Sequence, residues 1–170
     1  LNIIEGNGHC YWAGGMRLAW RKALEEKEKW HFFLLLNDDT VVWAHIGDSR
    51  LYLVRNNMLT QLTRDHSLVW ELLENGSINK SEAINHPQKN VLTRAVGIED
   101  NIKVELGSIK LFPNDLLLLC TDGLTNMLKS EVLIDILTQD IDIEDIVNIL
   151  VSSALDEGGT DNITTILVKY

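Results

Sequence analysis

The chain has 170 residues, 45% of them hydrophobic, which is enough apolar material for the core of one domain. It carries 15 basic against 25 acidic residues, a net charge of −10, which argues against nucleic acid or an anionic membrane surface as a partner. No apolar run approaches the roughly 20 residues that a membrane-spanning helix needs, and the first residues do not have the pattern of a signal peptide. Two isolated cysteines, Cys10 and Cys120, make neither a disulfide framework nor a zinc site, so we expect a reducing, cytoplasmic setting.

Residues 1–30 are predicted to form a glycine-rich loop followed by a helix. Four of the eleven glycines lie between Leu1 and Gly15. From Met16 to Trp30, apolar residues recur at helical spacing and charged residues cover the other side, which is typical of an amphipathic helix with a solvated face. Because the chain starts with leucine rather than methionine, we interpret it as a fragment or a processed form.

Strands are predicted after this helix. Short apolar segments alternate with turns, and Asn56-Asn57 is typical of a hairpin turn. Since the connections are too short for parallel crossovers, we expect an antiparallel meander. The predicted strands are Phe32–Leu36, Thr40–Ile46, Arg50–Val54 and Met58–Leu62.

The stretch from Asp65 to Asn90 is predicted to be helical and loop-like. Helices are expected over His66–Glu74, which Gly76 ends, and over Ser81–Ile84, which stops before Pro87. The stretch is polar and separates two blocks of strands. It could be a surface flap over a site or a simple connecting helical hairpin.

The remainder of the chain, from Ile102 onward, is predicted to combine strands with two helices. Leu116–Cys120 is uniformly apolar, which indicates a strand buried on both faces. Ser130 is the predicted N-cap of a helix that ends at Leu137. The other expected elements are strands at Ile102–Leu106, Ile109–Leu111 and Ile163–Val168, and a helix at Asp142–Leu155.

Two acidic residues share a context that favours a metal site. Asp122 follows the buried strand and precedes Gly123, and Asp161 lies in a glycine-containing loop before the last strand. Asp122 could simply cap the helix that follows it. Two such carboxylates brought together would repel unless a cation lay between them, and hard oxygen ligands indicate Mg²⁺ or Mn²⁺. A third acid, Asp48, could bind a metal, but we favour a turn-capping role with pairing to Arg50.

Five segments together resemble a known family. They occur in the order and spacing of the bacterial metal-dependent serine/threonine protein phosphatases of type 2C, the PPM family, and the resemblance covers roughly residues 31 to 170. The segments are Ala44–Tyr52, Leu62–Ser67, His86–Gly97, Cys120–Leu124 and Gly159–Thr164.

The resemblance implies an α+β fold in which two stacked antiparallel β-sheets are flanked by helices. It implies one phosphatase-like domain over residues 1–170, with an incomplete N-terminal part and a flap-like segment at residues 66–97. It also implies hydrolysis of phosphoserine and phosphothreonine by water held between two Mg²⁺ or Mn²⁺ ions, about 3.5–4 Å apart. Asp122 and Asp161 would be metal ligands, whereas His66 and His86 are expected to be structural.

The N-terminal region departs from the family pattern. The family has an upstream Asp-Gly whose aspartate bridges both metals, and the nearest counterpart here is Glu5-Gly6. In that register Glu5 would take the bridging position and Gly6 would offer its carbonyl. Asn126 stands where an acid often provides a further ligand. Two hypotheses follow, namely a phosphatase or a non-catalytic pseudophosphatase that serves as a regulatory binding module.

The resemblance also implies partners. We expect phosphorylated protein substrates, a serine/threonine kinase that acts in opposition, and no nucleic acid or membrane. We further expect a monomer.

Overall fold

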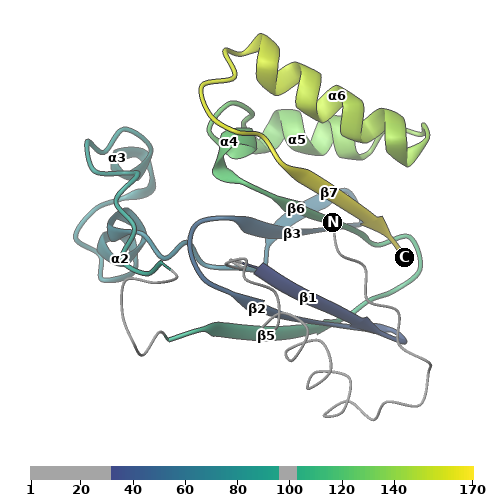
Figure 1. Cartoon of the computed structure of the whole chain (residues 1–170), viewed down its shortest axis with the longest axis horizontal. Coiled ribbons are helices and arrows are strands. Elements are labelled where there is room, and N and C mark those ends of the chain that lie inside the picture. Colours follow the sequence, from purple (N-terminus) through teal and green to yellow (C-terminus); the bar gives the residue numbers. More distant parts are fainter. Residues whose placement is uncertain (1–31, 96–102) are drawn as a thin grey trace, which may run out of the picture.

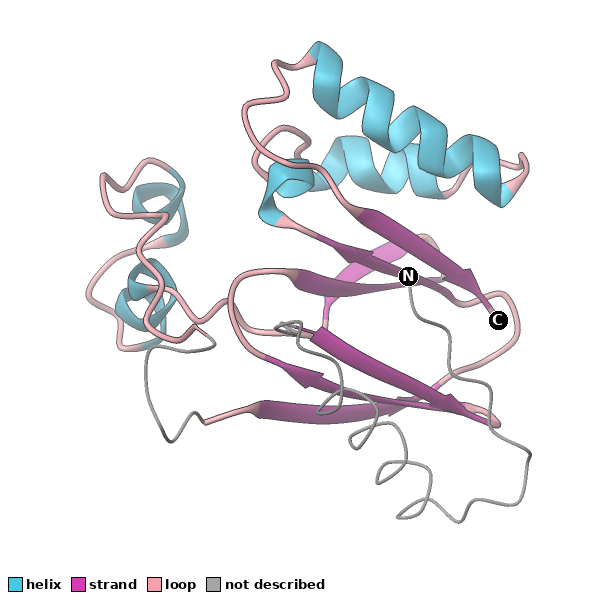
Figure 2. Ribbon diagram, viewed as in Figure 1, coloured by secondary structure: helices cyan, strands magenta, loops and turns pink. Residues whose placement is uncertain are grey.

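The computed structural model describes residues 32–95 and 103–170, which form two antiparallel sheets stacked face to face, with helices against one of them (Figures 1 and 2). The predicted pair of stacked antiparallel sheets flanked by helices is therefore confirmed. The predicted helix Met16–Trp30 and the candidate ligands Glu5 and Gly6 lie outside the described residues.

The first sheet contains three strands in the order β1-β2-β5. β1 spans Phe32–Asn37, β2 spans Thr40–His45 and β5 spans Glu105–Lys110.

β5 runs without a break through Gly107, so the prediction of two separate strands in this region was wrong. Gly107 lies opposite Trp43, and a Cβ on Gly107 would come within 2.1 Å of the indole ring. The glycine therefore makes room for a large side chain of the neighbouring strand instead of ending its own.

The second sheet contains four strands in the order β4-β3-β6-β7. β3 spans Arg50–Arg55, β4 Met58–Gln61, β6 Leu116–Cys120 and β7 Thr165–Lys169. The predicted hairpin turn is confirmed, since Asn56 and Asn57 both have positive φ.

The predicted meander is divided between the two sheets. β1 and β2 pair in the first sheet, whereas β3 and β4 pair in the second. The chain changes sheet at residues 47–49, where Gly47 has a φ of +109°. The turn that contains Asp48 therefore lies at the end of the sandwich, between the two sheets.

β3 and β6 occupy the centre of the second sheet and are buried on both faces. Leu51 and Leu53 of β3, with Leu117 of β6, pack toward the first sheet against Trp43 and its neighbours. The alternate residues of both strands pack against the helices instead. This two-sided burial explains the uninterrupted apolar run in β6 and confirms the strand predicted there.

Three helices cover the outer face of the second sheet: α4 (Asp122–Thr125), α5 (Ser130–Leu137) and α6 (Ile143–Asp156) (Figure 1). α6 buries Ile146, Leu150 and Ala154, which lie on one helical face at intervals of four residues.

Two helix starts differ from the prediction. Ser130 is the first residue of α5 and Lys129 occupies the N-cap position, so the predicted serine cap was wrong. Thr121, and not Asp122, occupies the N-cap position of α4.

The segment between β4 and β5 lies beside the sandwich rather than within its layers (Figure 1). It contains α2 (Leu68–Glu74) and α3 (Lys80–Ile84), and we call residues 66–95 the flap. Its two ends meet, because Leu68 N donates to Val91 O at 2.9 Å and Thr93 N donates to His66 O at 2.8 Å. Across the described residues, no helix has both the length and the apolar character that crossing a bilayer requires.

Candidate metal centre

The loops that carry Asp122 and Asp161 touch each other at one end of the second sheet. Thr121 N donates to Thr164 O at 3.1 Å, and the Thr121 hydroxyl donates to Asn162 O and accepts from Thr164 N, both at 3.0 Å. These bonds continue the pairing of β6 with β7 past the ends of the strands. They bring together two acidic loops that are far apart in the sequence.

Gly123 makes this close approach possible. A Cβ at this position would lie 2.4 Å from the carbonyl oxygen of Asn162 and 3.5 Å from the carbonyl carbon of Asp161. A side chain on residue 123 would therefore occupy the space that the main chain of the second acidic loop fills. The glycine of this Asp-Gly pattern is therefore required by packing, because only a residue without a side chain leaves room for the Asp161 loop.

Replacing Gly123 with alanine is expected to push the Asp161 loop away from α4. The atom that the new methyl group meets is a main-chain oxygen, which cannot rotate away as a side chain could. Such overpacking costs about 1–3 kcal/mol. We expect a lower free energy of unfolding in urea together with weaker Mn²⁺ binding, and wild-type values for both quantities would contradict this account.

A third acid, Asp48, approaches the same end of the molecule from the turn between β2 and β3. It is half-buried. Burial, followed by the negative charge of Asp122, raises the pKa of the Asp48 carboxyl above its usual value. Asp48 and Asp122 therefore lie close enough to repel each other.

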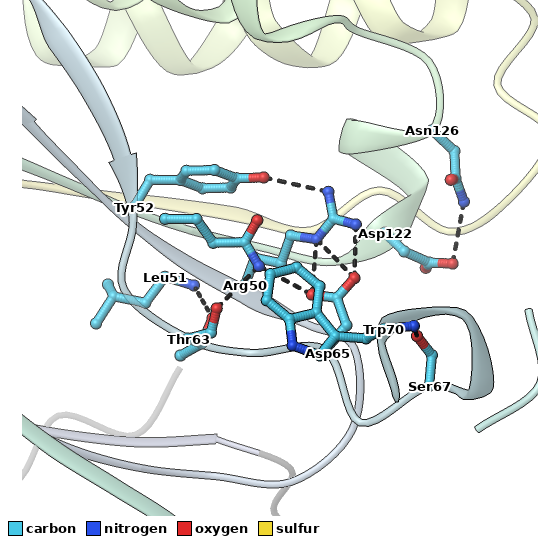
Figure 3. A network of polar contacts seen from close by, with 10 residues as sticks. Arg50, Leu51, Tyr52, Thr63, Asp65, Ser67, Trp70, Asp122 and Asn126 are labelled. Atoms are coloured by element: carbon cyan, nitrogen blue, oxygen red, sulfur yellow. Dashed lines mark hydrogen bonds and ion pairs between the residues drawn. The ribbon is translucent and has the colours of Figure 1, made fainter. Parts of the chain in front are cut away.

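The expected pairing of Asp48 with Arg50 is not a direct ion pair, although the charge of Arg50 still acts on the Asp48 carboxyl. The Arg50 guanidinium donates instead to both carboxylate oxygens of Asp65, with Nε–Oδ1 at 2.9 Å and Nη2–Oδ2 at 2.6 Å, and to the Tyr52 hydroxyl (Figure 3). Asp48 resembles Asp122 in one respect, since each follows the end of a strand.

Each of the two predicted ligands accepts a hydrogen bond from a residue close to it in the sequence. Asn126 Nδ2 donates to Asp122 Oδ2 at 3.1 Å (Figure 3), and Asn162 N donates to Asp161 Oδ1 at 2.7 Å. Asn126, at the position where an acid was expected, therefore serves as a hydrogen-bond donor to the Asp122 carboxylate.

A separate cluster of His45, His66 and Glu105 lies where the first sheet meets the flap. These three side chains are of types that can bind a metal, and their ligand atoms all lie within 4.8 Å of one another. No other group of three such side chains in the described part of the chain is this close. Glu105 Oε2 is 3.5 Å from both His45 Nδ1 and His66 Nε2. The two imidazole rings are stacked, with centroids 5.0 Å apart.

The environment of His66 favours its neutral form. Burial, followed by His45 and by the charge of Arg94, lowers the pKa of His66 below its usual value, although Glu105 and Asp65 act in the opposite direction. Its ring is 6% exposed, so the charged form would lose most of its hydration.

The stability of the protein should therefore fall when His66 is forced to ionise. A histidine whose pKa is lowered by folding binds fewer protons in the folded state than in the unfolded state. Its contribution to the free energy of unfolding is therefore complete above the ordinary pKa of 6.5 and is lost as the pH falls through the lowered pKa. Urea denaturation between about pH 5 and 8, the range in which histidines titrate, measures how the free energy of unfolding depends on pH. The difference between wild type and His66→Asn should shrink as the pH falls, and parallel pH profiles would refute the assignment.

Comparison with known proteins decides the family. Stp1, a serine/threonine phosphatase from Staphylococcus aureus, has a solved structure that superimposes on this chain with a TM-score of 0.78 at 32% sequence identity, covering 100% of this chain and 71% of that one. The chain belongs to the PPM family of serine/threonine phosphatases. The resemblance drawn from the five sequence segments is therefore confirmed.

Two further relatives of this PPM chain bear on its site. Protein phosphatase PhpP from Streptococcus pneumoniae is 47% identical over 136 residues, which are 80% of this chain and 55% of PhpP. The catalytic domain of the phosphatase PstP, solved in complex with two manganese ions, is 27% identical with a TM-score of 0.71, covering 91% of this chain and 66% of that one. No protein-family profile matches the chain. It spans about half the length of the curated relatives it matches.

Proposed function

We propose that this PPM-family chain is a metal-dependent protein phosphatase that hydrolyses phosphoserine and phosphothreonine in proteins. The observation that carries the proposal is the meeting of three acidic loops, those of Asp48, Asp122 and Asp161, at one end of the sandwich. The family relationship supports the reaction, since the relatives are serine/threonine phosphatases.

The residues at this end of the sandwich fit a divalent cation. Their donor atoms are carboxylate oxygens, the ligands that Mg²⁺ and Mn²⁺ prefer. Asp48 and Asp122 raise each other's free energy, as the raised pKa of Asp48 indicates, and a cation between them would remove that repulsion. The two manganese ions bound to the related PstP domain support the same metal class.

We assign metal binding to Asp122 and Asp161 and add Asp48 to that set. Glu5 and Gly6 remain proposed ligands from the sequence pattern. When bound, a pair of such ions would lower the pKa of a water molecule and offset the negative charge of a phosphoryl group.

The protein's own residues set the geometry of this site. Gly123 and Thr121 hold the Asp161 loop against the start of α4. The Asn126 amide fixes the Asp122 carboxylate. The flap stands beside the sandwich (Figure 2), and we propose that it contacts the bound substrate.

The remaining expectations become part of the same proposal. The substrates would be phosphorylated proteins, with a serine/threonine kinase acting in opposition. The net charge of −10 supports the expectation that neither nucleic acid nor an anionic membrane is a partner. We also propose a monomeric, cytoplasmic protein. In the described residues no feature favours the non-catalytic alternative over the enzyme.

Hydrolysis of a phosphothreonine peptide by the 170-residue chain tests the function. We expect phosphate release that requires Mn²⁺ or Mg²⁺, that EDTA abolishes, and that added Mn²⁺ restores. A parallel calorimetric titration with Mn²⁺ separates binding from turnover. Mn²⁺ binding without phosphate release from phosphoserine and phosphothreonine peptides would overturn the enzyme and favour the pseudophosphatase.

A further inference from the structure

We propose that His66 is a positioning residue whose neutral imidazole fixes the turn that carries Asp48 and joins that turn to the base of the flap. The inference rests on the proposed function only in assigning Asp48 to the metal centre. The linkage between turn and flap is a property of the fold and can be measured without metal.

His66 holds the residue before Asp48 through two hydrogen bonds. Gly47 N donates to His66 Nδ1 at 3.1 Å, and His66 N donates to Gly47 O at 2.8 Å. Both polar groups of the Gly47 main chain are therefore bound to one residue, which restricts the peptide that leads into Asp48.

The residues just before His66 hold the other side of the same turn. Asp65 accepts the bidentate hydrogen bonds of Arg50, and the Thr63 hydroxyl accepts a hydrogen bond from Leu51 N at 3.0 Å. The segment Thr63–His66 thus contacts the chain on both sides of Asp48. Gln61 Nε2 donates to Thr63 O and to Asp65 Oδ1, both at 2.9 Å, which ties the segment to β4.

The flap is attached at the same residue. His66 O accepts a hydrogen bond from Thr93 N at 2.8 Å, and Ser67 forms a bridge with Leu92. The side chain of His66 therefore reaches the Asp48 turn while its carbonyl reaches the returning end of the flap. A displacement of the flap base would move the imidazole and, through it, the acidic turn.

The hydrogen-bond pattern also fixes the tautomer and argues against a metal at this histidine. Because His66 Nδ1 accepts a hydrogen bond from Gly47 N, the proton of the neutral ring lies on Nε2, which faces Glu105 Oε2 at 3.5 Å. A metal-ligating histidine instead donates its other ring N–H to a partner. Glu105 Oε2 accepts a hydrogen bond from Arg64 N at 3.1 Å, which holds the carboxylate close to the Nε2–H group.

Burial and four ionisable neighbours determine which form of the ring is favoured. His45 and Arg94 disfavour the imidazolium, whereas Glu105 and Asp65 favour it. Burial disfavours the imidazolium more than His45 or Arg94 does, and together the three causes lower the pKa of His66. The neutral ring needed as an acceptor for Gly47 is therefore the form that the surroundings select.

The test compares His66→Phe with His66→Asn. Phenylalanine fills the buried space but has no acceptor, whereas asparagine places an oxygen near the position of Nδ1. We expect His66→Phe to speed amide hydrogen exchange at Gly47 and Thr93 and to weaken Mn²⁺ binding about tenfold, the range found for residues that position metal ligands. His66→Asn should keep both the slow hydrogen exchange and the Mn²⁺ affinity close to those of the wild type. His86→Phe is a matched control, because His86 Nδ1 accepts a hydrogen bond from Gln88 N inside the flap and, among the described residues, from no group near Asp48.

The outcomes separate this inference from the proposed function. If the wild type binds Mn²⁺ without turnover, the enzyme assignment fails while the Mn²⁺ affinities still test His66. If the wild type does not bind Mn²⁺, the rates of amide hydrogen exchange at Gly47 and Thr93 test the role of His66 by themselves. Equal exchange in wild type and His66→Phe, or equal defects in the Phe and Asn variants, would overturn the proposal. Should His66→Phe fail to fold, His66→Gln replaces it, because its amide extends past the Nδ1 position.

Discussion

Replacing Asp122 with asparagine is expected to weaken Mn²⁺ binding about a hundredfold or more and to abolish phosphate release under conditions that saturate the wild type. Loss of a residue that merely positions a ligand already costs about 10- to 100-fold, and Asp122 is proposed as a ligand itself. The substitution keeps the shape of the side chain and removes its charge. Calorimetry measures the affinity, and malachite-green detection of phosphate measures turnover.

The same variant should become slightly more stable without metal. Removing the Asp122 charge relieves its repulsion with Asp48, so the pKa of Asp48 should move down toward its usual value. Asp140→Asn is the matched control, because it removes one exposed acid in the connection between α5 and α6. An Asp122→Asn protein that binds Mn²⁺ as tightly as the control would exclude Asp122 as a ligand.

Replacing Arg55 with methionine is expected to lower the free energy of unfolding by about 3–5 kcal/mol, because it leaves a buried carboxylate without its cation. The Asp115 side chain is 3% exposed and receives hydrogen bonds from Arg55 Nε at 2.9 Å, Arg55 Nη2 at 2.6 Å and Phe112 N at 2.8 Å. These bonds, led by Arg55, lower the pKa of Asp115 below its usual value. The guanidinium also lies 4.6 Å from the centre of the Phe112 ring.

The effect should be asymmetric between the two partners. Asp115→Asn leaves Arg55 with 29% of its side chain exposed, so water can solvate the remaining charge and the loss should be smaller. Lys110→Met, which breaks the exposed pair with Asp39, should leave urea denaturation close to wild type. Equal midpoints for Arg55→Met and Lys110→Met would show that the buried pair does not stabilise the fold.

Local patterns predicted the elements whose burial is simple. Leu116–Cys120 was identified as a strand because both of its faces are apolar, and the structure buries both. The Asn56-Asn57 turn was identified because asparagine tolerates positive φ. The Asp-Gly pattern at residues 122–123 pointed to the end of the sandwich where the acidic loops meet.

Features that depend on contacts between distant segments were missed. Gly107 was interpreted as a break between two strands, because the sequence does not show that the large side chain of Trp43 lies opposite it. No local signal shows that β2 and β3 belong to different sheets. Asp48 was paired with its neighbour Arg50, whereas the guanidinium binds Asp65, fifteen positions away. Spacing in the sequence predicts partners that are close along the chain, whereas folding brings Asp65 from a distant segment to Arg50.

The buried thiol of Cys120, two residues before Asp122, can serve as a probe of local opening at the end of β6. Burial raises its pKa to about 12, so at neutral pH almost none of it is the reactive thiolate. In a chain whose other cysteine has been replaced by serine, a thiol reagent would modify Cys120 only when β6 separates from its neighbours. The labelling rate, with and without Mn²⁺, would then report how strongly occupancy of the acidic end restrains the breathing of the core.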